Sequence, residues 1–360
     1  MIREGDRVGN LTVLRLTSKI GITIWAFGVP QRSPGRVGPT WCYLIDSDKV
    51  TLVDPGDAVS SGILTSILDE TPFRLPDIER ILITHSHSDH DGALDVLLRD
   101  TKAELWTHIL YPYLRYQPAS LPPQANVVQK WMAEYQQTVS QKLVPQLTGK
   151  TPQELEGSIE NYDHHPLREK KLGHIEILET PGHTPDSICI IVDNFIITGD
   201  HILPYITPGA SVRLGYPNSL PQPLAEEYTR EAHYGLSVYL ESLARIETLG
   251  EKYTLLPGHF LFAKGQIRWQ PTKRAKQIGS NHLKRTKSIL DLMQDAPMDL
   301  HTITQRHFHP RVIQERGLDG SLASIACTID FLLERGYLGE TEDGKLFNEH
   351  AKQFDLLSEK

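Results

Sequence analysis

The chain has 360 residues, 39% of them hydrophobic and 23% charged, which is ordinary usage for a globular protein with a full core. Its net charge of −8 argues against wholesale nucleic-acid binding, and no apolar stretch approaches the ~18 residues that a membrane span requires. The start of the chain lacks an apolar signal segment, and the three cysteines are far apart without a CxxC pair, so we expect a cytoplasmic protein with neither a disulfide framework nor a thiolate metal site.

The first 110 residues predict a β-rich start followed by alternating helices and strands. Residues 8–56 alternate short β-rich runs with Gly, Pro and Asp turns, as a β-meander does, and the last run ends on Asp54. After residue 58, the periodicity predicts a helix, a strand, a second helix and a second strand, over residues 60–68, 80–84, 91–98 and 103–106. This alternation is typical of the α/β class.

Four potential metal ligands follow the predicted strand 80–84 within six residues: His85, His87, Asp89 and His90. Residues two apart in an extended segment face the same side, so His85 and His87 can share one metal. As the chain curls into the next helix, Asp89 and His90 turn to another side, where a second metal fits about 3.5–4 Å away. The alternative is a surface histidine cluster that binds no metal.

A long segment, residues 109 to about 168, follows this part of the chain. Residues 111–118 are rich in aromatic rings and proline, which predicts a loop with exposed rings. Apolar residues between 127 and 143 recur every three or four positions, which predicts an amphipathic helix. We interpret the segment as a lid that gives an acyl or aromatic substrate an apolar wall, with Tyr111, Tyr113, Tyr116 and Trp131 as candidate pocket residues. The alternative is a packing or dimerisation element, which leaves a homo-oligomer open.

Three further candidate ligands each follow a predicted strand in the second half of the chain. His183 lies on a Pro/Gly turn after residues 175–178, and Asp200 and His259 directly follow apolar runs. Proteins of the α/β class commonly build their sites at the carboxyl ends of strands. Each residue alone is a weak signal, but together with the cluster at 85–90 they form an ordered series.

The segment after Asp200 supplies another candidate for the pocket. Residues 207–223 form a Pro/Gly-rich loop that is placed to border the site, and Tyr205 just before it could reach a substrate. An ordinary connection to the next helix, predicted over residues 224–249, is the alternative.

Taken in order, Asp54, the cluster at 85–90, His183, Asp200 and His259 resemble the metallo-β-lactamase superfamily over roughly residues 10–265. The resemblance implies an α/β (α+β) fold, a four-layer αβ/βα sandwich with metals at its edge, and a catalytic domain over residues 1–265 that carries the insertion at 109–168. It also implies two divalent metal ions, the first held by His85, His87 and His183, the second by Asp89, His90 and His259, and both by a bridging Asp200. Asp54 would orient the site without binding a metal.

The ligand types determine the expected chemistry. Imidazole and carboxylate without thiolate suit zinc, which we favour, with iron or manganese as alternatives. A water shared by two such cations loses a proton near neutral pH and becomes a hydroxide nucleophile, so hydrolysis is the expected reaction. Asp89 and His201 are the candidate catalytic residues. His201 follows the bridging Asp200, as in the Gly-Asp-His of several bacterial hydrolases, and would orient the substrate or protonate the leaving group; a structural role is the alternative.

Two differences from known members of this superfamily narrow the range of expected substrates. The bridging position is Asp200 and not a cysteine, so antibiotic hydrolysis is not expected. Glyoxalase II-like thioesterases share the Asp bridge, but the chain has no convincing glutathione-binding tail.

The last third of the chain turns helical. Periodicity predicts helices over residues 283–293, 300–307 and 322–333, followed by a hairpin with its turn at 342–345, and this order resembles a winged-helix-like domain over residues 266–360. The third helix carries Asp330, Glu334 and a single Arg335 near its end. We therefore expect it to pack on the catalytic domain, and we do not expect DNA as a partner.

Positive charge gathers between residues 268 and 287, where no acidic residue occurs. Such a stretch can hold the phosphates of coenzyme A or an RNA backbone. The alternative is a solvated helix face or an inter-domain ion-pair surface. The basic residues are Arg268, Lys273, Arg274, Lys276, Lys284, Arg285 and Lys287.

Three functions follow from these features. The first, which we favour, is hydrolysis of an ester-like acyl bond in a small-molecule substrate, such as an acyl thioester of coenzyme A, an ester or a lactone. The second is phosphodiester cleavage, with RNA as the partner suggested by endoribonuclease relatives of this family. The third, a degenerate binding module, is disfavoured because every expected ligand position holds a suitable residue.

Overall fold

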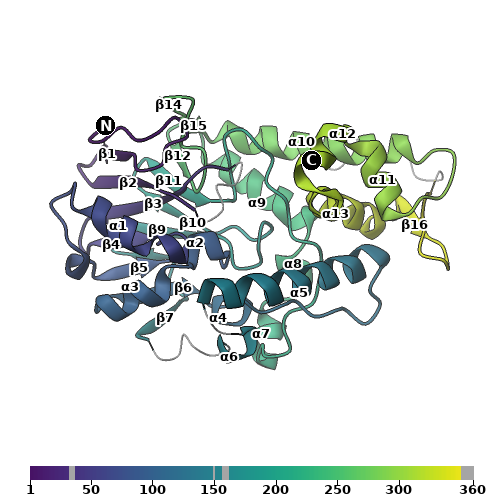
Figure 1. Cartoon of the computed structure of the whole chain (residues 1–360), viewed down its shortest axis with the longest axis horizontal. Helices are drawn as coiled ribbons and strands as arrows, with labels where there is room; N and C mark the ends of the chain where they lie inside the picture. Colours follow the sequence, from purple (N-terminus) through teal and green to yellow (C-terminus); the bar gives the residue numbers. More distant parts are fainter. Residues whose placement is uncertain (32–36, 149–150, 156–161, 350–360) are drawn as a thin grey trace.

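A computed structural model describes residues 1–31, 37–148, 151–155 and 162–349 of the chain. Two β-sheets lie face to face in one half of the molecule, with helices on their outer faces, and the C-terminal helices lie at the opposite end (Figure 1). Within these ranges, no helix is both long enough and apolar enough to cross a membrane.

The first sheet contains seven strands in the order in which they occur in the chain. The first four pair antiparallel, which confirms the predicted meander, and the strands from the fourth to the seventh pair in parallel. The seventh strand lies in the segment 109–168, where its His-His-Pro-Leu sequence carries no strand signal. The strands are β1 (Val13–Thr17), β2 (Thr23–Val29), β3 (Thr40–Asp46), β4 (Thr51–Val53), β5 (Arg80–Leu82), β6 (Glu104–His108) and β7 (His164–Leu167).

The second sheet contains six strands in the order β15-β12-β11-β10-β9-β8. Its β11 and β12 pair in parallel, so their carboxyl ends lie side by side at one edge. The strands are β8 (Lys171–Leu172), β9 (Ile175–Glu179), β10 (Ile188–Val192), β11 (Phe195–Gly199), β12 (Thr254–Pro257) and β15 (Gln270–Pro271), and a separate hairpin pairs β13 (Phe262–Ala263) with β14 (Gln266–Ile267).

Successive side chains of a strand point to opposite faces of its sheet, so each sheet packs against the other sheet on one face and against helices on the other. In β10, Ile190 packs between the sheets, whereas Cys189 and Ile191 pack on the outer face in the same core as helix α9 (Leu236–Thr248). The outer face of the first sheet is covered by α1 (Ser61–Leu68) and α3 (Leu94–Asp100). This arrangement confirms the predicted four-layer αβ/βα sandwich.

The helix predicted over residues 91–98 is wrong in its bounds. The chain forms α2 (Ser88–Asp91) and then α3, with Gly92 between them. A β-carbon at Gly92 would lie 2.4 Å from the Ser88 carbonyl oxygen and 2.7 Å from the Ala58 nitrogen. The chain therefore approaches its own backbone too closely here for any other residue, and this contact is not visible in the periodicity.

The single helix predicted over residues 224–249 is also wrong. Three helices occupy this region: α7 (Gln222–Glu227), α8 (Arg230–His233) and α9. The backbone is extended at Thr229 and Tyr234, and Gly235 has a φ of 97°. That left-handed conformation interrupts the helix although the apolar periodicity continues.

The start of the long segment is buried, which corrects the predicted loop with exposed rings. Residues 111–114 form the short helix α4 (Tyr111–Leu114), and Tyr111 and Tyr116 are 1% and 8% exposed. The Tyr111 hydroxyl and the Arg115 guanidinium both donate to Asp91, and the guanidinium lies 4.7 Å from the centre of the Tyr116 ring. A buried ion pair requires cover from water, which explains why the rings turn inward.

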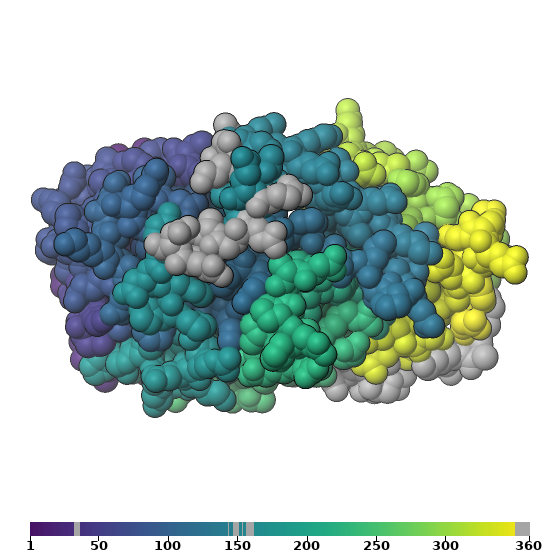
Figure 2. All heavy atoms as spheres, turned by 90° about the horizontal axis from the view of Figure 1, so that it is seen from below, coloured from purple at the N-terminus to yellow at the C-terminus, as the bar shows by residue number. Residues whose placement is uncertain are grey.

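The amphipathic helix predicted in the same segment is present as α5 (Val127–Thr148), and α6 (Pro152–Leu155) follows it. Figure 1 shows α5 starting beside the C-terminal helices and running toward the sheets. In Figure 2, blue-teal atoms of this part of the chain lie between the purple N-terminal part and the yellow C-terminal part. Val128 and Met132 of α5 belong to the same core as α9 and the C-terminal helices.

The C-terminal part contains four helices and a hairpin instead of the three helices predicted. The additional helix, α12, has no buried residue, so it has no apolar periodicity by which to recognise it. The elements are α10 (Lys273–Leu292), α11 (Leu300–His307), α12 (Pro310–Arg316), α13 (Leu318–Glu334), β16 (Leu338–Glu340) and β17 (Leu346–Asn348).

Asp330 of α13 joins the C-terminal helices to the rest of the protein. Its carboxylate is 1% exposed and accepts hydrogen bonds from Asn126 and Gln129 beside the start of α5, at 3.0 and 3.1 Å. It also accepts from the backbone nitrogen and Nε of Arg213, at 3.0 and 3.1 Å. These contacts confirm the expected packing of this helix on the preceding part of the chain.

We predict that Asp330→Ala lowers the free energy of unfolding by about 3 kcal/mol, because Arg213 and two amides lose their buried acceptor. Urea denaturation followed by circular dichroism measures the change. Asp291→Ala, which removes an exposed pair with Lys287, is the control and changes the free energy of unfolding by less than about 1 kcal/mol. Equal effects of the two substitutions would contradict a stabilising role for the Asp330 network.

Candidate metal centre

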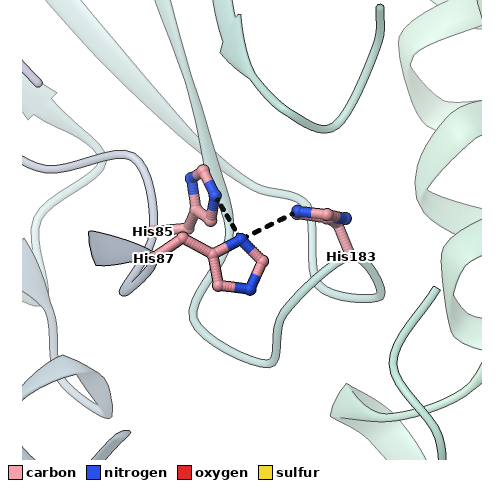
Figure 3. Close-up of side chains that lie close together, drawn as sticks. All are labelled: His85, His87 and His183. Atoms are coloured by element: carbon pink, nitrogen blue, oxygen red, sulfur yellow. Dashed lines mark hydrogen bonds between the residues drawn. The ribbon is translucent and has the colours of Figure 1, made fainter. Parts of the chain in front are cut away.

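Three imidazoles meet at the edge of the sandwich, after the ends of β5 and β9. Nε2 of His85 lies 3.1 Å from Nδ1 of His87, and Nε2 of His183 lies 3.3 Å from the same atom. Figure 3 shows the His85 and His183 rings directing these nitrogens toward His87. The three nitrogens surround one point, as the ligands of a single cation do.

A second group of potential ligands contains Asp89, His90 and His259. Nε2 of His259, which follows β12, lies 3.1 Å from Oδ2 of Asp89, and Nε2 of His90 lies 3.9 Å from that oxygen. Asp89 and His90 belong to α2, whereas His85 and His87 precede it. The turn into the helix thus separates the four residues into two pairs.

Asp200, which follows β11, lies between the two groups. Its Oδ1 is 3.4 Å from Nε2 of His90 and 3.5 Å from Nε2 of His259. Its Oδ2 is 4.0 Å from Nε2 of His183 in the first group. One carboxylate therefore directs one oxygen toward each group.

Hydrogen bonds of the second ring nitrogen hold four of the five imidazoles in place. Nδ1 of His183 lies 2.8 Å from the Gly209 carbonyl oxygen, and Nδ1 of His259 lies 3.0 Å from that of Pro39. Because a carbonyl oxygen only accepts, Nδ1 carries the proton in both rings, and Nε2 keeps its lone pair for a cation. His85 and His90 are held in the same way by side chains described next.

The Asp54 carboxylate is hydrogen-bonded to both ligand groups, directly to His90 and through the Thr84 hydroxyl to His85. It is 1% exposed and accepts hydrogen bonds from the Thr84 backbone nitrogen at 2.8 Å, from the Thr84 hydroxyl at 2.6 Å and from Nδ1 of His90 at 2.9 Å. Since the Thr84 hydroxyl donates to Asp54, it accepts from Nδ1 of His85, 3.0 Å away. Asp54 has a φ of 53°, which is rare outside glycine and is stabilised here by these contacts.

Two glycines allow the ligand loops to converge. A β-carbon at Gly199 would lie 2.5 Å from the Thr84 hydroxyl oxygen, and one at Gly258 would lie 2.6 Å from Cε1 of His90 and 2.8 Å from Oδ1 of Asp200. Each glycine directly precedes a candidate ligand, Asp200 or His259. Side chains at these positions would therefore push the ligands apart.

The charges of the ligands suit cation binding. Burial and neighbouring imidazoles hold the pKa of His85 well below its usual range, so this ring is neutral near pH 7. The pKa of His87 is lowered in the same direction by desolvation and by the neighbouring His183, although its side chain is the exposed member of the group. Burial opposes the ionisation of Asp89 and Asp200, but the imidazoles of His90 and His259 outweigh it and lower the pKa of both carboxyl groups.

Two buried atoms of the site, 3.4 Å apart, make no hydrogen bond to any described residue and fit a divalent cation. Nε2 of His90 and Oδ1 of Asp200 are buried, and neither has a hydrogen-bond partner in the described part of the chain. Burying such atoms without a partner is costly, whereas a cation would satisfy both. Imidazole and carboxylate donors without thiolate suit zinc, iron or manganese.

An apolar hollow of about 540 Å³ opens beside the first group and includes His87 and His183 in its lining. Its walls come from α5, from residues 114–119, from residues 209–212 and from α13. None of the described residues that line it is a lysine, arginine, aspartate or glutamate. The apolar lining residues include Leu114, Met132, Val139, Val144, Val212, Tyr234 and Ala323.

Of the aromatic residues proposed for the pocket, some lie in or beside the lining of the hollow and others lie elsewhere. Tyr116 lines the hollow, and Trp131 stacks at 5.1 Å on Tyr135, which also lines it. Tyr111 points instead to Asp91. Tyr113 packs with Ile109, Leu110 and Leu220, and Tyr205 packs against Phe260 at 5.8 Å, so neither is in the lining.

His201 directly follows Asp200 in the chain, and its side chain is buried, with an exposed fraction of 1%. Its ring packs edge-on to Tyr239 at 5.0 Å, and the Tyr239 hydroxyl donates to the His201 carbonyl oxygen. Burial lowers the pKa of His201 to about 3, so the ring is neutral near pH 7. It is not among the residues that line the hollow.

Two residues near the ligands were not expected from the sequence. Gln31 donates from Nε2 to Oδ2 of Asp89 at 3.1 Å, and Asp186 accepts at 3.2 Å from Ser86, which lies between His85 and His87. Asp186 is three residues past His183, and its place in that turn was an available signal. Gln31 has no local signal, because its contact depends on the pairing of distant loops.

Comparisons with known proteins identify one family for this chain. The family model described as the metallo-beta-lactamase superfamily matches residues 35–259, a range that contains every candidate ligand. Two curated relatives are named probable metallo-hydrolases. YqjP of Bacillus subtilis (strain 168) is 32% identical over 105 residues, 28% of this chain and 32% of that protein, so the match spans about a third of its length.

The second relative, from Methanocaldococcus jannaschii, is 30% identical over 167 residues, which cover 45% of this chain and 67% of that protein. Among solved structures, a metallo-beta-lactamase family protein from Thermus thermophilus has a TM-score of 0.61 at 21% identity. That likeness covers 91% of this chain and 98% of the other, and it concerns the fold.

We predict about two metal ions per chain, and a clear loss of metal in His87→Ala and Asp200→Ala, because each substitution removes a donor from the converging set. Inductively coupled plasma mass spectrometry measures metal content. His174→Ala, at an exposed histidine away from the cluster, is the control and keeps its metal. Unchanged metal content in both site variants would contradict the assignment.

We also predict that Asp54→Ala weakens metal binding by about 10- to 100-fold, because His90 and Thr84 lose the acceptor that orients the ligands. Competition with a chromophoric chelator measures the affinity, and Asp46→Ala, at the exposed last residue of β3 in the same meander, serves as the control. An affinity equal to that of the unmodified protein would show that Asp54 has no orienting role.

Proposed function

Since the chain belongs to the metallo-beta-lactamase superfamily, we propose that it is a binuclear metal-dependent hydrolase that cleaves an ester-like acyl bond in a thioester, an ester or a lactone. The observation that carries the binuclear proposal is the Asp200 carboxylate, which directs Oδ1 to His90 and His259 and Oδ2 to His183. A site for one cation would leave one of these oxygens without a role.

In this proposal His85, His87 and His183 hold one cation, Asp89, His90 and His259 hold the other, and Asp200 bridges them. When bound, two divalent cations lower the pKa of a water and polarise a substrate carbonyl. Zinc is our preferred metal, with iron and manganese as alternatives. Asp54 and Thr84 keep the imidazoles oriented, and Gln31 and Asp186 restrain the loops that carry Asp89 and His87.

The expected reaction is hydrolysis of the acyl bond. The oxygen of water forms a bond to the acyl carbon, the bond from that carbon to the leaving oxygen or sulfur breaks, and the leaving group takes up a proton. His201 is neutral near pH 7, buried and packed on Tyr239, which favours the structural role over leaving-group protonation. Asp89, at the edge of the ligand set, is the better candidate for proton transfer.

The hollow beside His87 and His183 supports an acyl substrate over a phosphodiester. A polyanionic substrate such as RNA requires cationic side chains, and no lysine or arginine is among the described residues that line the hollow. Several residues of the basic stretch 268–287 are engaged elsewhere. Arg274 donates to the Leu203 and Ile206 carbonyl oxygens, Lys276 pairs with Glu247, and Lys287 pairs with Asp291.

We predict that the metal-loaded protein hydrolyses p-nitrophenyl butyrate, a thioester or a lactone at least about tenfold faster than bis-p-nitrophenyl phosphate. The rates are measured side by side at one pH. The double variant Lys273→Glu and Lys284→Glu, at exposed positions, leaves acyl hydrolysis unchanged because these lysines lie outside the hollow.

Preferred cleavage of the phosphodiester, together with its loss in the charge-reversal variant, would replace the acyl proposal by the phosphodiesterase alternative. A protein freed of metal that still hydrolyses its substrate would contradict metal dependence altogether.

A further inference from the structure

The apolar hollow is built from parts of the chain that are far apart in sequence. The lining includes the loops of His87 and His183, Met132 and Val139 of α5, and residues 209–212. Ala323 of α13 completes the lining, so the C-terminal helices reach the same hollow as the candidate metal ligands.

The helix that presents Ala323 also holds two of the other walls. Asp330 lies seven residues after Ala323, which is two helical turns and therefore on the same face of α13. Its carboxylate accepts from Gln129 of α5 and from Arg213, which directly follows Val212 of the lining. One buried carboxylate thus fixes α5, the loop 209–212 and α13 relative to one another.

We infer that α13 is a specificity-determining element: Ala323 limits how long a hydrophobic acyl group the hollow accepts, and Asp330 positions the walls around it. This inference rests on the proposed function. The predicted substrate class is an ester or thioester whose acyl group is an uncharged aliphatic or aromatic chain. A short acyl group stays near His87 and His183, whereas a longer one contacts Ala323.

The chemistry of the lining supports this substrate class. Its side chains are mainly apolar, and its polar members, such as Ser140, Gln136 and Thr184, are uncharged. A volume of about 540 Å³ lies in the usual range for small-molecule sites. Apolar contacts of this kind discriminate between substrates by size, because each added methylene is buried or excluded.

The inference is tested by enlarging Ala323. We expect Ala323→Leu to lower the ratio of kcat/KM for p-nitrophenyl octanoate to that for p-nitrophenyl acetate by about tenfold or more, because the added carbons occupy the space of the longer chain. Ala323→Val should give a smaller change in the same direction. Ala244→Leu is the matched control, since Ala244 is an exposed alanine of α9 that lines a different hollow.

Binding supplies a readout that does not depend on turnover. Isothermal titration calorimetry with octanoate should detect binding to the metal-loaded unmodified protein and to Ala244→Leu, and weaker binding to Ala323→Leu. Metal content, measured on each variant, shows whether the metal centre is intact.

The outcomes separate this inference from the proposed function. If no ester is hydrolysed by the unmodified metal-loaded protein but octanoate binding is lost in Ala323→Leu, the acyl hydrolase proposal fails and the pocket inference stands. An unchanged ratio of octanoate to acetate hydrolysis in Ala323→Leu with normal metal content would overturn the inference. Octanoate binding that is absent from the unmodified protein, or equal in all variants, would also overturn it.

Discussion

The structure depends on gathering five imidazoles and two carboxylates at one edge of the sandwich, where His85, His90 and His259 are buried and His87 is exposed. Burial disfavours the protonated form of an imidazole and the ionised form of a carboxyl group, so such a cluster is stable only if opposite charges and lone pairs face each other. Here the Asp200 carboxylate lies between the ligand groups, and Nε2 of His90 beside it has no hydrogen-bond partner in the described chain. This arrangement fits the candidate metal centre, because a cation would satisfy these atoms.

The fold makes this gathering possible through the direction of its strands. The candidate ligands follow β5, β9, β11 and β12, which end at one edge of the two-sheet sandwich. Asp54, which follows β4, accepts hydrogen bonds from both Thr84 and His90 and so links the loops after β4 and β5. The loops of His87 and His183 also line the apolar hollow beside the ligands.

Much of the fold and the convergence of the candidate metal ligands could be predicted from the sequence, because their signals are local. A histidine or aspartate directly after an apolar run marks the end of a strand, and the spacing of residues 85–90 divides those ligands between two sides. The predicted meander, the four-layer sandwich and the packing of α13 on the preceding part of the chain are confirmed, and the structure adds that Asp330 makes this contact.

The remaining features depend on contacts between distant residues. Tyr111 and Tyr116 are buried because Arg115 pairs with Asp91, and this pairing has no trace in periodicity. The break before α9 depends on the conformation of Gly235, and the apolar hollow is lined in part by Ala323, which is an ordinary helical alanine in the sequence. Local patterns identify the donors of a site well, but they do not identify the walls around it.

The most direct test of the central claim is a crystal structure of the metal-loaded protein with anomalous diffraction data collected at the absorption edge of the bound metal. The account predicts two anomalous peaks about 3.5–4 Å apart, with one Asp200 oxygen toward each. A single peak, or two peaks of which Asp200 contacts only one, would contradict a binuclear centre bridged by this carboxylate.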